Sequence, residues 1–117
     1  MQYNFKIHKS IVNTIWYYVE VEEKEYYTLN NFTSHGWTTS KIQEIINGIE
    51  QSETKPKGEE YVWGNEDLNL YANENGVLLV DMAVQRAKQH DPITLRLTHE
   101  EIISFLQDFK KFVEENS

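Results

Sequence analysis

Histidine can act as a general base or as a metal ligand, and this sequence of 117 residues contains four. They are scattered and show no His-x-His or His-x-x-x-His spacing, which would bring two imidazoles onto one metal ion. The most site-like cluster is Ser34-His35-Gly36-Trp37, where a hydroxyl adjoins an imidazole. However, there is no Gly-x-Ser-x-Gly elbow, and adjacent residues rarely present nucleophile and base to each other. We therefore predict no metal site and interpret the cluster as a loop that leads into a helix.

Carboxylate pairs are the other candidates for catalysis. Glu59-Glu60 and Glu66-Asp67 are sequence neighbours, so in an extended chain their side chains would point to opposite faces and make a poor acid and base pair. The five glycines are isolated, which excludes a Gly-rich phosphate loop, and the absence of cysteine excludes thiolate chemistry. The sequence therefore predicts a protein that is not an enzyme and holds no cofactor. For the enzyme alternative, His35 is the residue to mutate first.

The charge is acidic and unevenly distributed. Nineteen acidic residues against eleven basic ones give a net charge of -8, which opposes nucleic acid and anionic lipid as main partners and favours a basic protein. Residues 59–81 hold six acidic groups and no Lys or Arg, and residues 20–25 hold four acidic groups and one Lys. Aromatic rings in such a field can be buried in an interface while the field steers the partner. The predicted partner-binding residues are Glu59, Glu60, Glu66, Asp67 and Glu74, with Tyr71 as the anchor.

These assignments have structural alternatives. An acidic small domain is often merely soluble, and Tyr71 and Trp63 can serve only for packing. Asp81 lies inside an otherwise apolar run, so it needs hydrogen bonds or a cation if it is buried. Arg96 is its predicted partner within the chain.

Alternating apolar residues predict two groups of strands. In the first group, residues 15–21 alternate with period two, Tyr27 and Leu29 continue the pattern as the second arm of a hairpin, and residues 3–7 form a strand before it. In the second group, Gly64-Asn65 and Asn75-Gly76 act as turn signals, because Asn-Gly readily takes positive φ values. They predict an antiparallel meander whose strands are residues 60–63, 67–72, 77–84 and 93–98.

Two segments have the apolar period of a helix. The first follows Ser40, which has the capping-box spacing to Gln43, although Gly48 within it costs about 1 kcal/mol relative to Ala. The second follows Thr98 and Glu101, which repeat that spacing. Their apolar stripes are Ile42, Ile45, Ile46 and Ile49 in the first helix, and Ile102, Ile103, Leu106, Phe109 and Val113 in the second.

Together these elements predict an α+β fold. The expected order is β-β-α-β-β-β-β-α, with both helices on one face of an antiparallel sheet made of the hairpin and the meander. Residues 1–117 have the length of a single domain. The longest early apolar run, residues 15–19, is shorter than the roughly 7 to 15 residues of a signal peptide or the roughly 20 of a membrane helix. We therefore expect a cytoplasmic protein, and the lack of cysteine permits that compartment.

In size, acidity, lack of cysteine and layout, the chain resembles the immunity proteins of bacterial contact-dependent growth inhibition systems. The resemblance implies an α+β protein that binds and blocks the toxic C-terminal domain of a cognate effector, frequently a nuclease. A looser likeness is to the uncharacterised YacL-type proteins of enteric bacteria, and it implies no activity. It rests on Gly58-Glu59-Glu60-Tyr61 followed by Trp63, on Ala72-Asn73, and on Phe112-Val113 at the end of an apolar helix.

Two functions from different classes follow. The leading hypothesis is an immunity-type inhibitor that occludes a basic toxin domain, such as a nuclease with a positive cleft, through its acidic surface. The alternative is a small homo-oligomeric structural or regulatory domain that pairs through an exposed strand edge, with acidity that only prevents aggregation.

Overall fold

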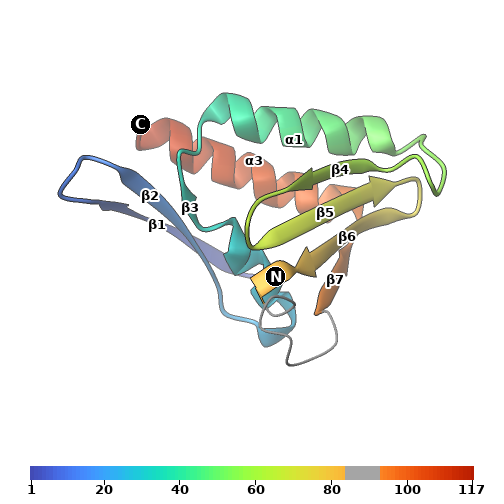
Figure 1. The fold of residues 1–117 in the computed structure, drawn as a ribbon, viewed down its shortest axis with the longest axis horizontal. Coiled ribbons are helices and arrows are strands. Elements are labelled where there is room, and N and C mark those ends of the chain that lie inside the picture. The colour runs from blue at the N-terminus through green and yellow to red at the C-terminus, as the bar shows by residue number, and fades with distance from the viewer. Residues whose placement is uncertain (84–92) are drawn as a thin grey trace.

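Two antiparallel sheets lie on one side of a pair of helices (Figure 1). The computed structural model describes residues 1–83 and 93–117. The first sheet has the strand order β1-β2-β3 and the second β4-β5-β6-β7. The elements are β1 (Tyr3–Lys9), β2 (Ile15–Val21), the 3-10 helix η1 (Lys24–Phe32), β3 (Ser34–His35), α1 (Thr39–Ser52), β4 (Tyr61–Gly64), β5 (Leu68–Asn73), β6 (Gly76–Asp81), β7 (Thr94–Leu97) and α3 (His99–Glu115). The α+β class is confirmed and the order agrees in outline, but the strands form two sheets where one was predicted.

The N-terminal hairpin consists of β1 and β2, which pair along seven residues from Tyr3 opposite Val21 to Lys9 opposite Ile15. The predicted pairing of β2 with a strand at Tyr27 and Leu29 is wrong, because η1 occupies that segment. Its Leu29 and Phe32 are fully buried; they are three residues apart and so lie on the same side of a helix with three residues per turn.

Side chains bind the β2 backbone where the predicted strand would have paired. The side-chain oxygen of Asn30 accepts a hydrogen bond from the backbone N–H of Val21 at 2.9 Å. The hydroxyl of Thr33 accepts one from the N–H of Val19, also at 2.9 Å. The side chains of Asn30 and Thr33 therefore provide hydrogen-bond acceptors for these backbone N–H groups of β2, in place of a neighbouring strand.

The second sheet is the predicted antiparallel meander. Its register places Tyr61 opposite Ala72 and Val77 opposite Leu97. The Asn75-Gly76 turn also forms as predicted: Gly76 has a φ of 131°, a region that favours glycine, and the Asn73 side chain accepts the N–H of Asn75 at 2.8 Å. Strand β6 ends at Asp81, and Val84 of the predicted run lies outside the described residues. One face buries the alternating residues Leu68, Leu70, Ala72, Val77 and Leu79.

Both predicted helices are present. The sequence predicted the N-cap residue of α3 correctly but not that of α1. α3 starts at the predicted capping box: the Thr98 hydroxyl accepts the N–H of Glu101 at 3.1 Å, and the Glu101 carboxylate accepts the N–H of Thr98 at 2.9 Å. α1 starts earlier than the Ser40 spacing indicates, because Thr38 is its N-cap and accepts the N–H of Lys41 at 3.1 Å. A threonine hydroxyl serves as the N-cap acceptor in both helices.

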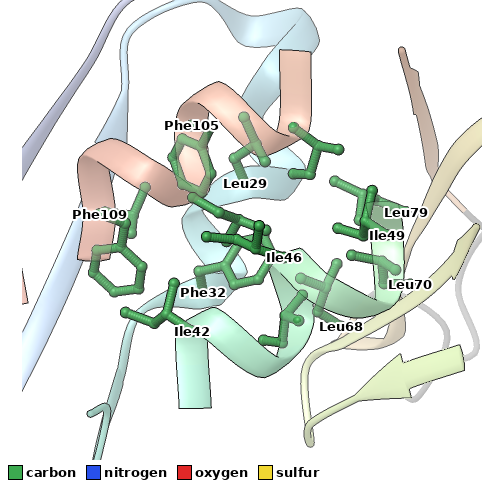
Figure 2. Packing of buried hydrophobic residues seen from close by; sticks show 14 of the residues in the cluster. Leu29, Phe32, Ile42, Ile46, Ile49, Leu68, Leu70, Leu79, Phe105 and Phe109 are labelled. Atoms are coloured by element: carbon green, nitrogen blue, oxygen red, sulfur yellow. The ribbon is translucent and has the colours of Figure 1, made fainter. Parts of the chain in front are cut away.

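The core joins both helices, η1 and both sheets in a single cluster of buried side chains. Figure 2 shows its centre, where Phe32 of η1 lies among side chains of α1 and α3. Sheet β1-β2-β3 joins through rings, since Phe5 lies 5.2 Å from Phe109 between ring centroids. The labelled side chains are Leu29, Phe32, Ile42, Ile46, Ile49, Leu68, Leu70, Leu79, Phe105 and Phe109.

The start of β1 is tied to α3 by a hydrogen bond from the Tyr3 hydroxyl to the Asp108 carboxylate. Burial, and then the hydrogen bond and charge of Asp108, raise the pKa of Tyr3 well above its ordinary value. This pairing therefore contributes its full stability below the ordinary tyrosine pKa of about 10, and that stability is lost as the pH rises through the raised folded-state pKa.

We expect the free energy of unfolding to fall less steeply in Tyr3→Phe than in the parent protein above about pH 10. Urea unfolding measured at several pH values between about 8 and about 11 tests this. If the free energy of unfolding falls equally steeply with pH in the two proteins, the expectation is contradicted.

Candidate functional site

The predicted partner-binding carboxylates form two groups at opposite ends of the second sheet. Because Tyr61 pairs with Ala72, Glu59 and Glu60 lie at the end of β5 that leads into Glu74. Glu66 and Asp67 lie in the β4–β5 turn at the other end. β5 has six residues, so at about 3.3 Å per residue the groups are separated by roughly 17–20 Å. The acidic run of the sequence therefore borders the sheet at two ends and does not form one cluster.

Tyr71 lies between the two groups, on the face of the sheet opposite the helices. It pairs with Val62 on one side and with Leu78 on the other, and these three side chains share that face. Val62 is 58% exposed, while Tyr71 and Leu78 are half-buried. Arg96 of β7 stands opposite Leu78 on the same face. The outer face thus has an apolar and aromatic centre, and carboxylates lie beyond both of its ends.

Residues 59–81 contain no Lys or Arg, but folding brings cationic side chains from outside that range to the end of the sheet near Glu60. A hollow of about 500 Å³ there is lined by Lys57, Glu60, Tyr71 and Arg96, among others. The Glu60 carboxylate accepts the backbone N–H of Gly58 at 2.9 Å. That hydrogen bond is the main cause of the lowered pKa of Glu60, and Asn73 and Lys57 lower it further. This end of the sheet is therefore mixed in charge.

The predicted pair of Asp81 and Arg96 does not form. Asp81 is aligned with Leu68, which is on the buried face of the sheet, whereas Arg96 is on the outer face. Strand alternation therefore points the two side chains to opposite faces. One carboxylate oxygen of Asp81 accepts a hydrogen bond from the backbone N–H of Ala83 at 3.0 Å. The segment just after β6 therefore supplies one of the hydrogen bonds that the Asp81 carboxylate needs.

An aromatic hollow that the sequence did not indicate lies between α1, β4 and residues 34–37. Its volume is about 370 Å³, and its walls include Trp37, Tyr61 and Trp63. The rings of Trp37 and Trp63 are stacked 5.7 Å apart, and Trp63 also stacks on Phe32 at 5.6 Å. Because side chains alternate along a strand, the predicted strand 60–63 puts Tyr61 and Trp63 on one face. Nothing in the sequence indicated that Trp37 would meet them, because that contact requires α1 to pack on β4.

The rim of the aromatic hollow carries two charged residues of α1. The Lys41 ammonium donates to the backbone carbonyl of Gly36 at 2.8 Å. Glu44 lies one turn further along, and among the described residues it forms no ion pair. Burial raises the pKa of Tyr61, and the charge of Glu44 adds to that effect. The hollow therefore combines aromatic walls with one cation and one carboxylate at its edge.

A smaller hollow of about 280 Å³ shares Ser34 and His35 of β3 with the aromatic hollow, and its lining also includes Trp16, Glu66 and Asp67. The His35 ring meets Trp16 edge to face at 4.9 Å. The Ser34 hydroxyl donates to the backbone carbonyl of His35 at 3.2 Å, and neighbouring side chains in a strand point to opposite faces. The Ser34 hydroxyl and the His35 ring therefore do not face each other in β3.

The described residues form neither a metal-binding cluster nor a membrane-spanning helix. Within residues 1–83 and 93–117, no three His, Asp or Glu side chains come together in a way that could hold a metal ion. In the same residues, no helix has the length and apolarity needed to cross a membrane. No protein-family model, curated protein or solved structure matches the chain.

Proposed function

We propose that the protein is an immunity-type inhibitor that binds and neutralises a basic toxin domain, such as a nuclease, through the outer face of the β4–β7 sheet. The observation that carries this proposal is the outer face itself, where Val62 and Tyr71 provide an apolar centre between two groups of carboxylates. Stable protein interfaces commonly have this plan, with aromatic and apolar residues in the centre and polar residues around them.

The negative net charge of this chain indicates that its partner is positively charged. Steering by a net charge of -8 favours a positively charged protein, and a nuclease needs a positive cleft to hold its phosphate backbone. Glu59 and Glu74 are exposed at one end of the face and can supply both the field and ion pairs with the partner. Lys57 and Arg96 at the same end restrict which partner charges fit there, so they contribute to specificity.

The test is binding to the toxic domain encoded beside the gene for this chain. We expect Tyr71→Ala to weaken binding at least about tenfold, which corresponds to about 1.4 kcal/mol, because it removes the central ring. We expect the double change Glu59→Lys and Glu74→Lys to slow association, with an effect that shrinks at high salt. Surface plasmon resonance at two salt concentrations measures both rates.

A matched control separates a specific surface from general acidity. Glu114→Lys with Glu115→Lys makes the same change in net charge at exposed positions at the end of α3. If this control slows association as much as the variant of Glu59 and Glu74, the outer face has no special role. If the neighbouring gene encodes no toxic domain, or if that domain does not bind, the proposed function is wrong.

A further inference from the structure

The turn of the β1–β2 hairpin presents two adjacent apolar side chains to solvent. Ile11 is 102% exposed and Val12 is 79% exposed. The turn is held by its own hydrogen bonds, since the N–H of Ser10 donates to the carbonyl of Thr14 at 2.9 Å and the N–H of Thr14 donates to the hydroxyl of Ser10 at 3.2 Å. In Figure 1 this tip projects past the C-terminal end of α3. The apolar side chains are therefore presented on an ordered protrusion.

The start of the chain carries positive charge in an otherwise acidic protein, although Lys6 of β1 forms an ion pair with Glu20 of β2 at 3.1 Å. Residues 1–19 contain Lys6 and Lys9 and no acidic residue, so all 19 acidic residues lie elsewhere in the chain. Lys9 directly precedes the turn, and Ile7, which is 44% exposed, extends the apolar surface of the tip down β1. A binding partner for the tip should therefore offer an apolar cavity with a carboxylate at its edge.

The aromatic hollow of this same chain has those properties. Its walls include Trp37, Tyr61 and Trp63, and both Lys41 and Glu44 line it. The Lys41 ammonium is bound to the backbone carbonyl of Gly36, which leaves the Glu44 carboxylate as the acceptor for an incoming cation. Its 370 Å³ lies in the range of cavities that receive small apolar groups. The hairpin cannot fold back into its own hollow, because β1 and β2 are paired along their full seven residues and β2 is anchored in the core by Tyr17 and Val19.

We propose that the hairpin tip of one chain docks into the aromatic hollow of a second copy, with Ile11 and Val12 against the tryptophan rings and Lys9 near Glu44. Reciprocal exchange of the two hairpins closes a dimer with two-fold symmetry, in which each chain gives a tip and receives one. The outer face of the β4–β7 sheet takes no part in the contact. Self-association and toxin binding are therefore separable.

The first experiment measures mass in solution by light scattering and sedimentation from micromolar to millimolar concentration. A concentration-dependent dimer is expected for the parent chain. It should be lost in the double variant Ile11→Asp and Val12→Asp, whose positions are too exposed to affect folding. Val62→Asp is the matched control, because it adds a charge at another exposed apolar position outside the proposed contact, and it should leave the dimer intact. A parent chain that stays monomeric throughout, or a dimer that survives the tip variant, overturns the proposal.

A second experiment tests which surface receives the tip. The chain has no cysteine, so every disulfide formed by single-cysteine variants involves the introduced thiols, and the mixed product can be told from the two symmetric dimers by mass if one variant carries a tag. Val12→Cys mixed with Glu44→Cys should yield a mixed disulfide dimer under mild oxidation, whereas Val12→Cys mixed with Glu50→Cys, exposed further along α1, should yield little. Equal yields overturn the proposal. If the tip variant is monomeric like its parent but loses toxin binding, the tip serves the toxin and self-docking is wrong.

Discussion

Replacing Phe105 by alanine should lower the free energy of unfolding by about 3–5 kcal/mol, the usual loss for a fully buried Phe. Phe105 has no exposed surface. Its ring lies 5.0 Å from Tyr3 of β1 and 5.5 Å from Phe32 of η1, measured between centroids. A single α3 side chain thus joins the N-terminal sheet to the 3-10 helix. The cavity left by alanine would have walls from three elements that cannot close on it together.

Chemical denaturation monitored by circular dichroism measures this loss. Domains of this size are stable by about 5–15 kcal/mol, so a loss of about 3–5 kcal/mol is a large fraction of the total and should clearly lower the denaturant midpoint. Phe112→Ala is the matched control on the same helix, because Phe112 is only half-buried and should cost clearly less. Equal losses for the two variants would mean that Phe105 has no special part in joining β1 to η1.

Gly48→Ala should destabilise the protein by about 1–3 kcal/mol, the range for inserting a group into a packed site. Helix propensity alone predicts the opposite, a gain of about 1 kcal/mol. The reason is the ring of Tyr61, because a Cβ at position 48 would lie 2.3 Å from two of its atoms. Tyr61 must therefore leave its place against α1 or the helix must move away from β4.

A double-mutant cycle with Tyr61→Ala isolates this contact. Once the ring is gone, Gly48→Ala should become neutral or stabilising, as propensity predicts. The coupling between the two positions is read from denaturant midpoints at constant m-value. If Gly48→Ala costs the same free energy in both backgrounds, the close approach to Tyr61 is not its cause.

Local signals in the sequence were sufficient for most of the fold. Alternating apolar residues indicated the strand that forms β5, and the turn at Gly76 indicated the start of β6. The Thr98 capping box located the start of α3. These features depend on residues within one turn or one strand, so the sequence carries them directly.

Features that depend on distant contacts could not be predicted. Tyr27 and Leu29 have strand spacing, yet η1 forms because the Asn30 and Thr33 side chains bind the β2 backbone. The six acidic groups of residues 59–81 look continuous in the sequence, but strand pairing sends them to opposite ends of the sheet. Gly48 was counted as a cost to α1, whereas it is what allows Tyr61 to lie against the helix.

The placement of the tryptophans has a spectroscopic consequence. Trp16, Trp37 and Trp63 are the only three in the chain, and all of them line the two hollows that adjoin β3. Intrinsic fluorescence excited at the red edge therefore reports on one small region of the molecule and is nearly blind to the outer face around Tyr71. A partner that quenches or shifts the emission must have reached the hollows or changed the packing around them. A partner that binds without any spectral change has a contact surface elsewhere on the protein.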